Sequence, residues 1–149
     1  MFRLVLLLLP VFLCAEIQSS SERVIYKKIE NVFNKFKEGF ENNDIDQIMN
    51  VFGPDVTLEF HNFTKKFENV KKGIEGALNS SVCYSYAYEI KEILVAPDFV
   101  VVRVDWTVTS TDKATGNFLE TNIEKGIDIF KYYGTENALK IYRSFAYEV

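Results

Sequence analysis

The best candidates for proton transfer in this sequence are four carboxylates on segments whose pattern predicts long strands. They are Asp105, Glu120, Glu124 and Asp128. A carboxylate that is desolvated among tyrosines has a raised pKa and can act as a general base. The alternative, which we favour, is that these residues line the solvent-facing or partner-facing side of an antiparallel sheet. Asp128 is the best catalytic candidate of the four.

His61 is the only histidine of the chain, so any histidine chemistry depends on it alone. Alternation along its strand turns its side chain away from the side that Phe60 faces, and we expect a rim or surface residue rather than a general base. A histidine-based metal site needs several ligands at fixed spacing, and the sequence has no such cluster. There is also no nucleophile motif and no glycine-rich phosphate loop. We therefore expect no metal and no cofactor.

Aromatic side chains are the more suggestive feature of the second half of the chain. Tyr84, Tyr86 and Tyr88 alternate on one face of a predicted strand. Later strands carry further large aromatic residues: Trp106, Phe130, Phe145 and Tyr147. Aromatic walls suit an apolar pocket with a few polar groups, and they suit an ordinary core or a dimer interface equally well.

The first fifteen residues have the order of a secretory signal peptide. Arg3 gives a positive start, residues 4–13 form an uncharged apolar run, and small residues at Cys14-Ala15 precede a polar stretch. The run is shorter than the ~20 residues that a membrane span needs. We expect cleavage after Ala15, or at the latest by residue 20, and a secreted, extracellular product that does not bind membranes. A buried N-terminal strand is the alternative, and the bulky Leu13 argues against a lipoprotein signal.

Charge, cysteine content and sequons refine this expectation. The formal net charge is −4, and it becomes −5 when Arg3 leaves with the leader, which disfavours nucleic acid and anionic membranes as partners. Without Cys14, Cys83 is the only thiol; we expect a buried small hydrophobe there, and the alternative is an intermolecular disulfide. Two N-x-S/T sequons, at Asn62 and Asn79, predict glycosylation of a water-facing surface in an exported protein.

Hydrophobic periodicity predicts helices first and strands after them. Apolar residues at three- and four-residue steps predict helices at 22–41, 44–51 and 67–78, and Gly53-Pro54-Asp55 reads as a turn. Alternating apolar residues predict strands at 56–61, 82–95, 99–110, 118–133 and 139–147. The last four follow one another through short loops, which predicts an antiparallel meander. The expected class is α+β, with N-terminal helices packed in a curved antiparallel sheet. A cystatin-like fold, which has one helix, is the alternative; the additional helices argue against it.

Two stretches resemble a known superfamily. Residues 36–58, with Asn43-Asp44-Ile45 before a short helix and Gly53-Pro54-Asp55-Val56 before a strand, resemble the opening of the nuclear-transport-factor-2-like (NTF2-like) superfamily. Residues 125–130 and 139–142 resemble the last hairpin of its SnoaL-like and DUF4440-type branches, and Asp128 lies within this part. The resemblance covers nearly the whole exported chain. It implies a cone-shaped α+β domain over residues 22–149, a pocket between helices and sheet, and homodimers formed through the outer sheet face.

The superfamily does not imply one function, because it includes isomerases, cyclases, dehydratases and members that only bind ligands or partners. Its ketosteroid isomerases have a catalytic aspartate at the end of the first strand. On Thr57-Leu58-Glu59-Phe60 that position is Phe60, and Glu59 points to the opposite face. The resemblance therefore does not carry ketosteroid isomerase chemistry onto this chain.

Our interpretation is a secreted, dimeric domain that binds a small apolar ligand or a protein partner and lacks dedicated catalysis. The expected ligand-binding residues are Phe36, Leu58, Phe60, Trp106 and Asp128. One alternative is an isomerase, dehydratase or hydrolase that uses Asp128 or another pocket carboxylate with a tyrosine. Another is an interaction module that uses the outer sheet face, with the pocket filled by its own side chains.

Overall fold

The computed structural model describes residues 20–60 and 63–148, with the backbone alone at 147 and 148. Three helices and six strands follow in the order α1 (Ser20–Glu41), α2 (Ile45–Met49), β1 (Phe52–Phe60), β2 (Phe63–Lys66), α3 (Phe67–Leu78), β3 (Val82–Val95), β4 (Phe99–Asp112), β5 (Phe118–Tyr133) and β6 (Ala138–Glu148). The leader predicted at residues 1–15 lies outside this range. The predicted α+β class is confirmed, and the structure has three helices where the cystatin-like alternative has one.

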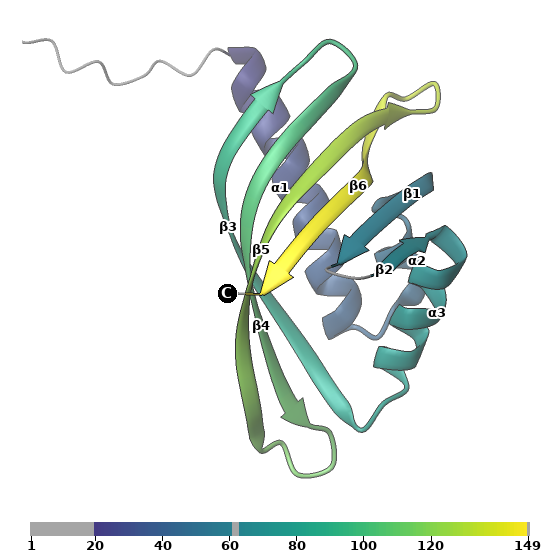
Figure 1. Ribbon diagram of the computed structural model, residues 1–149, viewed down its shortest axis with the longest axis vertical. Helices are drawn as coiled ribbons and strands as arrows, with labels where there is room; N and C mark the ends of the chain where they lie inside the picture. Colours follow the sequence, from purple (N-terminus) through teal and green to yellow (C-terminus); the bar gives the residue numbers. More distant parts are fainter. Residues whose placement is uncertain (1–19, 61–62, 149) are drawn as a thin grey trace, which may run out of the picture.

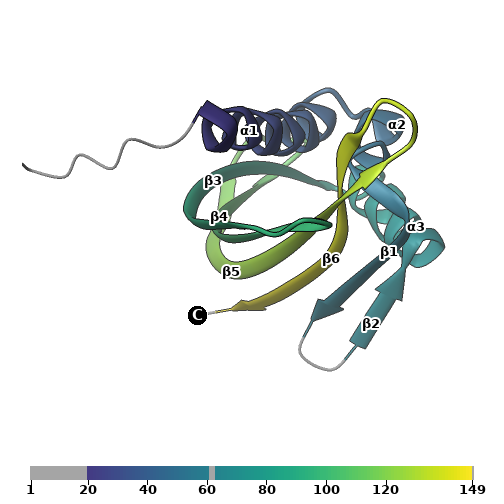
Figure 2. The same cartoon turned by 90° about the horizontal axis from the view of Figure 1, so that it is seen from above.

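The six strands form one sheet in the order β2-β1-β6-β5-β4-β3. The meander from β3 to β6 is antiparallel throughout, as predicted. β1, however, runs parallel to β6, so the sheet is mixed and not wholly antiparallel. The strand that β1 joins lies far along the chain, so local alternation could not show the direction of this pairing. In Figure 2 the strands curve beneath α1, while α2 and α3 lie at the end of the sheet beside β1. Figure 1 shows α1 crossing behind β5 and β6.

The helices form where the apolar spacing predicts them. α1 buries one face, with Ile29 and Phe33 fully enclosed, and it starts two residues earlier than predicted. α2 is shorter than predicted: Asp44 stays outside as its N-cap and accepts a hydrogen bond from the Gln47 amide. The 67–78 prediction matches α3. Among the helices that the structure describes, none combines the length and the apolar character needed to cross a bilayer.

The predicted turn at Gly53-Pro54-Asp55 is wrong, because these residues belong to β1. The pairing of β1 with β6 shifts register between Phe52 and Thr57, so the missing N–H of Pro54 falls where the ladder is irregular. Gly53 allows close packing, since a Cβ atom there would lie 2.5 Å from the ring of Tyr133. Sequence reasoning also missed β2, whose Phe63 is half exposed, because this short strand has no buried face that would create alternation.

The core lies between α1 and the inner face of the sheet. Val100, Val102 and Val104 of β4 are fully buried there, and Trp106 packs against them as the predicted alternation requires. Tyr84, Tyr86 and Tyr88 of β3 also pack on this core. The neighbouring Cys83 faces the other side and is exposed, so the expectation of a buried thiol is wrong.

Candidate functional site

A cavity of about 110 Å³ lies between α1 and the inner face of the sheet. All five residues expected to bind a ligand line it: Phe36, Leu58, Phe60, Trp106 and Asp128. They come from α1, β1, β4 and β5, and they meet because strand alternation points every second side chain inward. The cone is therefore not completely filled by its own side chains. Whether these residues bind a ligand stays a prediction.

Aromatic rings form one corner of the cavity. Phe36 lies 5.6 Å from Trp106 between ring centroids, at an interplanar angle of 61°. Tyr86 lies 5.1 Å from Phe36 at 74°, and 6.2 Å from Trp106 at 85°. Such edge-to-face contacts fix the rings relative to one another. We call these three residues the aromatic corner.

Asp128 supplies a buried acid to this cavity. It is 3% exposed, it lies opposite Ser144 on β6 and Val102 on β4, and its side chain hydrogen-bonds to that of Ser144. Burial raises the pKa of Asp128 to about 6, because the charged carboxylate loses its water, while the Ser144 hydrogen bond acts in the opposite direction. The favoured expectation that the strand carboxylates face solvent or a partner is thus wrong for Asp128.

Glu124 and Gly126 precede Asp128 on the same face of β5 and also line the cavity. Burial, together with the negative charge of Glu124, raises the pKa of Tyr86, so its phenol stays a hydrogen-bond donor. Gly126 leaves room between the two acids. A Cβ atom there would lie 3.5 Å from the Phe145 carbonyl oxygen, an ordinary contact, so the backbone does not require glycine. Sequence reasoning missed Gly126 and Ser144; the alternating pattern Glu-x-Gly-x-Asp was the available signal.

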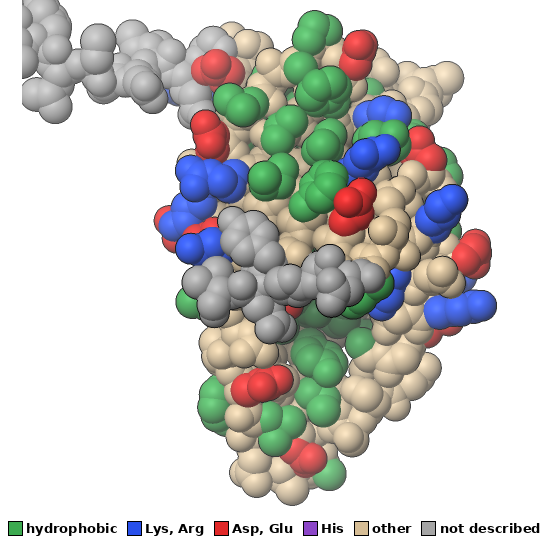
Figure 3. Space-filling model, in the orientation of Figure 1, with side chains coloured by type: hydrophobic (Ala, Val, Ile, Leu, Met, Phe, Trp, Pro, Cys, Tyr) green, Lys and Arg blue, Asp and Glu red, His purple; other side chains and the backbone are tan. Residues whose placement is uncertain are grey.

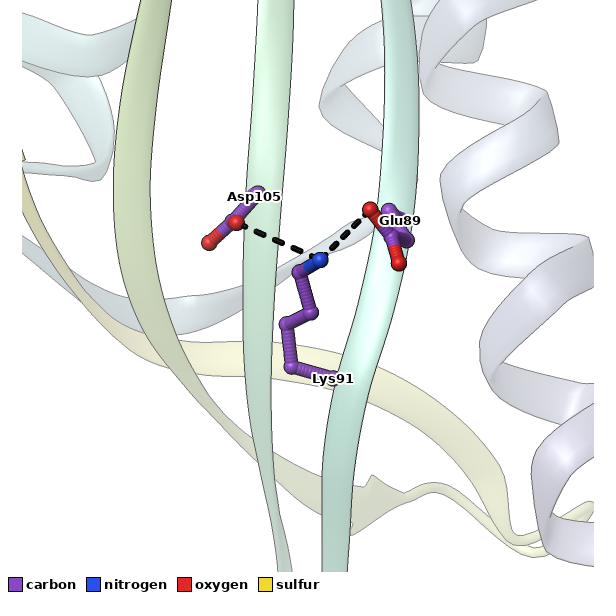
Figure 4. A network of polar contacts seen from close by, with 3 residues as sticks. All are labelled: Glu89, Lys91 and Asp105. Atoms are coloured by element: carbon purple, nitrogen blue, oxygen red, sulfur yellow. Dashed lines mark ion pairs between the residues drawn. The ribbon is translucent and has the colours of Figure 1, made fainter.

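The other two candidate carboxylates do not reach the cavity. Figure 4 shows Lys91 between Glu89 and Asp105, at 2.5 Å and 3.6 Å. Glu89 and Asp105 are direct cross-strand neighbours, and Lys91 at the β3 bulge offsets their repulsion. Its carboxylate partners also raise the pKa of Lys91, the hydrogen bond to Glu89 most of all. Glu120 is exposed farther along β5.

His61 and Asn62 lie outside the described residues. The second sequon is placed: Asn79 is the exposed C-cap of α3. The hydroxyl of Ser80 beside it donates to the carbonyl oxygens of Ala77 and Val82, while Ser81 is exposed. Within residues 20–60 and 63–148, no group of three or more His, Cys, Asp and Glu side chains could hold a metal ion.

A wider groove of about 880 Å³ runs along α1, α2 and β1. Its polar groups pair with one another: the Gln47 side-chain amide donates to the Lys35 carbonyl at 3.1 Å and to Glu38 at 3.3 Å. These contacts are exposed to solvent, and the groove contains no buried ionisable group. The inner cavity, with its buried acid and fixed rings, is the better candidate site.

A known family and several solved structures share this architecture. The family model of the SnoaL-like domain matches residues 33–134. No curated protein matches the sequence. A solved ketosteroid isomerase-like protein from Erwinia carotovora atroseptica is 19% identical, with a TM-score of 0.66 over 83% of this chain and 95% of that one.

Two further solved structures show the same arrangement. A conserved protein from Planctomyces limnophilus has a TM-score of 0.71 at 13% identity, over 85% of this chain and 99% of that one. ActVI-ORFA from Streptomyces coelicolor has a TM-score of 0.70 at 9% identity, over 84% and 97%. At such identities the likenesses show the fold alone, and they confirm the cone-shaped NTF2-like fold.

Proposed function

Because the chain belongs to the SnoaL-like domain family, we propose that its inner cavity binds a small, largely apolar molecule whose polar group meets Asp128. The observation that carries this proposal is the combination of an aromatic corner with a buried carboxyl group in one cavity. Binding sites of this kind are mostly apolar, with few polar groups that fix orientation. Dedicated catalysis is not part of the proposal, since Phe60, which the resemblance aligns with the isomerase aspartate, lines the cavity with an apolar ring.

Trp106 makes this proposal testable, because it is the only tryptophan of the chain and it lines the cavity. Titration of the purified protein with cyclopentanol is expected to change the Trp106 fluorescence with saturation. Gly126→Ala keeps ordinary contacts but takes room inside the cavity. In the complex the added methyl group would crowd the bound cyclopentanol. Overpacking of this kind costs ~1–3 kcal/mol, so cyclopentanol binding should weaken about tenfold.

Gly76→Ala is the matched control, because a Cβ atom on Gly76 meets nothing within 4 Å and the residue is exposed on α3. It should leave the titration unchanged. Fluorescence that stays constant at millimolar cyclopentanol, in a protein with native circular dichroism, would refute the binding proposal.

A second candidate is proton transfer by Asp128 in an isomerase, dehydratase or hydrolase-type enzyme. The buried acid, whose pKa burial raises to about 6, favours it, because a base that titrates near neutral pH can accept and return a proton. Cyclopentanone in D₂O offers a ring-matched probe. The enzyme reading expects faster hydrogen–deuterium exchange beside the carbonyl, detected by NMR, and loss of that acceleration in Asp128→Asn. An exchange rate equal to that in buffer alone would reject proton transfer by Asp128 for small cyclic ketones.

We also propose that the protein is exported after its leader is cleaved, and that its last hairpin relates it to the DUF4440-type branch as well as to the SnoaL-like one. Asn79, exposed at the end of α3, supports glycosylation in that pathway. Native mass spectrometry of the protein from its own source measures the cleavage site, glycans, oligomeric state and any retained ligand together. An intact leader on the mature protein would contradict export.

The proposed homodimer uses the outer face of the sheet. Ile123 and Ile127 of β5 alternate with the cavity-lining residues and are 52% and 38% exposed. In Figure 3 hydrophobic side chains gather along this face, which is turned away from α1. A partner protein on the same face is the remaining alternative.

A further inference from the structure

A separate cavity of about 480 Å³ lies on another side of α1, and none of the residues that line the inner cavity lines it. Its walls are the middle of α1, the end of α2, and the turn that leads into β6. In Figure 1 the first part of β6 lies beside the start of β1, close to the end of α2 in the chain. We call this cavity the lysine groove after Lys28, Lys35 and Lys140, which line it.

The three lysines concentrate positive charge in the lysine groove. Lys28 and Lys35 are seven residues apart on α1, so they lie on the same side of the helix, two turns or about 10 Å from each other. Lys140 lines the groove from β6. Among the described residues of its walls, Glu136 is the only acid. The groove is therefore locally positive, although the chain as a whole has a net charge of −4.

Contacts with neighbouring side chains hold two of these lysines in place. The Lys140 ammonium group donates a hydrogen bond to the side-chain oxygen of Asn50 at 2.9 Å. The Lys28 ammonium group lies 5.5 Å from the centroid of the Tyr132 ring, a cation–π distance. Both partners are uncharged, so the two ammonium groups keep their attraction for an anion. Side chains that are already held lose less conformational freedom when a ligand binds.

The walls of the lysine groove also include apolar side chains. Val32 lies between Lys28 and Lys35 along α1, and Val51 and Leu139 line the same space. All three apolar residues belong to the hydrophobic core, so their positions are fixed. A ligand that is charged along its whole length would place polar atoms against them. A ligand with charged ends and an apolar middle matches both kinds of wall.

We propose that the lysine groove binds elongated dianions, in which an apolar chain joins two carboxylate groups at about the spacing of Lys28 and Lys35. One carboxylate pairs with Lys28. The other pairs with Lys35 and Lys140, and the chain between them packs on Val32. The lysine groove is distinct from the inner cavity, so a ligand there is independent of the proposed function.

Nearby acids and exposure to water limit the affinity that the lysine groove can reach. Lys35 and Lys140 also line the wider groove described above. That groove has three acids in its wall: Glu38, Asp44 and Asp46. Exposed ion pairs are weak and are screened by salt, so we expect dissociation constants in the millimolar range at low ionic strength.

A series of chain lengths separates the proposed fit from attraction by charge alone. Succinate, adipate and suberate carry the same two charges on progressively longer apolar chains. Each is titrated at low salt into the ¹⁵N-labelled protein, while NMR follows the backbone amide signals of the groove residues Asn31, Lys35 and Asn137. We expect suberate to bind about threefold more tightly than succinate, because only the longer chain reaches both ends of the groove. Equal dissociation constants across the series, or signals that do not move at tens of millimolar, overturn the proposal.

Three variants test the residues that carry the proposal. Lys28→Gln should remove the preference for suberate, because one end of the groove loses its charge. Glu136→Gln, at an exposed turn, removes the acid from the wall and should tighten suberate binding about threefold. Lys72→Gln is the matched control, because it removes an exposed lysine on α3 that does not line the groove, and it should change neither affinity.

The variants also decide against the proposal if it is wrong. Lys72→Gln that weakens suberate binding as much as Lys28→Gln does would show a general attraction of the surface for anions and would overturn the assignment to the lysine groove. If Lys28→Gln does not fold, Glu136→Gln decides: an unchanged affinity for suberate in that variant overturns the proposal.

Discussion

Asp128 and Asp105 lie on adjacent strands, yet their surroundings differ in kind. Asp105 lies beside Lys91, whereas Asp128 faces the cavity without a positive side chain among its described neighbours. Alternation places Asp105 opposite the valine row of β4, but it could not place Asp128, because both faces of β5 carry large apolar residues, such as Ile127 on one and Phe130 on the other. Leu58, Phe60 and Trp106 were easier to predict, since each shares its face with a clear apolar row.

Replacing Asp128 by asparagine should remove a pH-dependent loss of stability. Its pKa is about 6 when folded and ~3.9 when unfolded, so the folded state binds the proton more tightly. Its favourable contribution is complete below pH 4 and is lost as the pH rises to 6, a decrease of about 3 kcal/mol. The difference in unfolding free energy, Asp128→Asn minus wild type, should therefore rise by about that amount between pH 4 and pH 7.

Urea denaturation at half-unit pH steps measures this change. Glu120→Gln, at an exposed position on β5, serves as the control and should run parallel to wild type. An Asp128→Asn curve that also runs parallel to wild type would show that Asp128 titrates alike in the folded and unfolded states.

At the scale of elements, a close contact joins α1 and α2, the two helices that precede β1. Gly39 lets the two helices approach: a Cβ atom there would lie 3.1 Å from the Ile48 amide nitrogen and 3.2 Å from the Asp44 carbonyl oxygen. These are backbone atoms, which cannot rotate away. The sequence predicted both helices, but it did not predict this contact or β1 pairing with β6, because non-local partners leave no local periodicity.

Glycine-to-alanine exchanges in two helices should have opposite effects. Alanine favours helix by about 1 kcal/mol over glycine. At Gly76 nothing lies within 4 Å of the new methyl group, so Gly76→Ala should raise the unfolding free energy by up to that amount. At Gly39 the methyl group collides with buried Ile48, and overpacking of ~1–3 kcal/mol should exceed the gain. Thermal unfolding of both variants checks the signs; stabilisation by Gly39→Ala would contradict the helix contact.

At the scale of the whole molecule, the sheet has two faces with different tasks. Its inner face holds the core and the cavity, and its outer face carries an apolar row together with polar ladders such as Thr109–Thr121, whose hydroxyl oxygens lie 3.1 Å apart. The class, the antiparallel meander and the inner residues were predictable from alternation. The use of the outer face was not, because exposed apolar residues indicate an interface without naming its partner.

A charge in the middle of the outer face should separate the proposed dimer. Ile127→Asp changes an exposed side chain, so folding should be little affected, while desolvation of the carboxylate in an interface should shift the protein to monomer. Light scattering coupled to size exclusion measures the mass. Val24→Asp, which is exposed on α1, is the control and should leave the dimer intact. A wild-type monomer at high concentration would exclude the dimer.

The parallel pairing of β1 with β6 also sets the order in which the site can assemble. Asn50 and Lys140, which flank this pairing, are 90 residues apart and hydrogen-bond at 2.9 Å. Such non-local contacts form slowly, because a long loop must close first. The cavity walls from β1 and β6 meet only after the ribosome has made the final strand. A chain that lacks β6 therefore leaves the cavity without one of its walls.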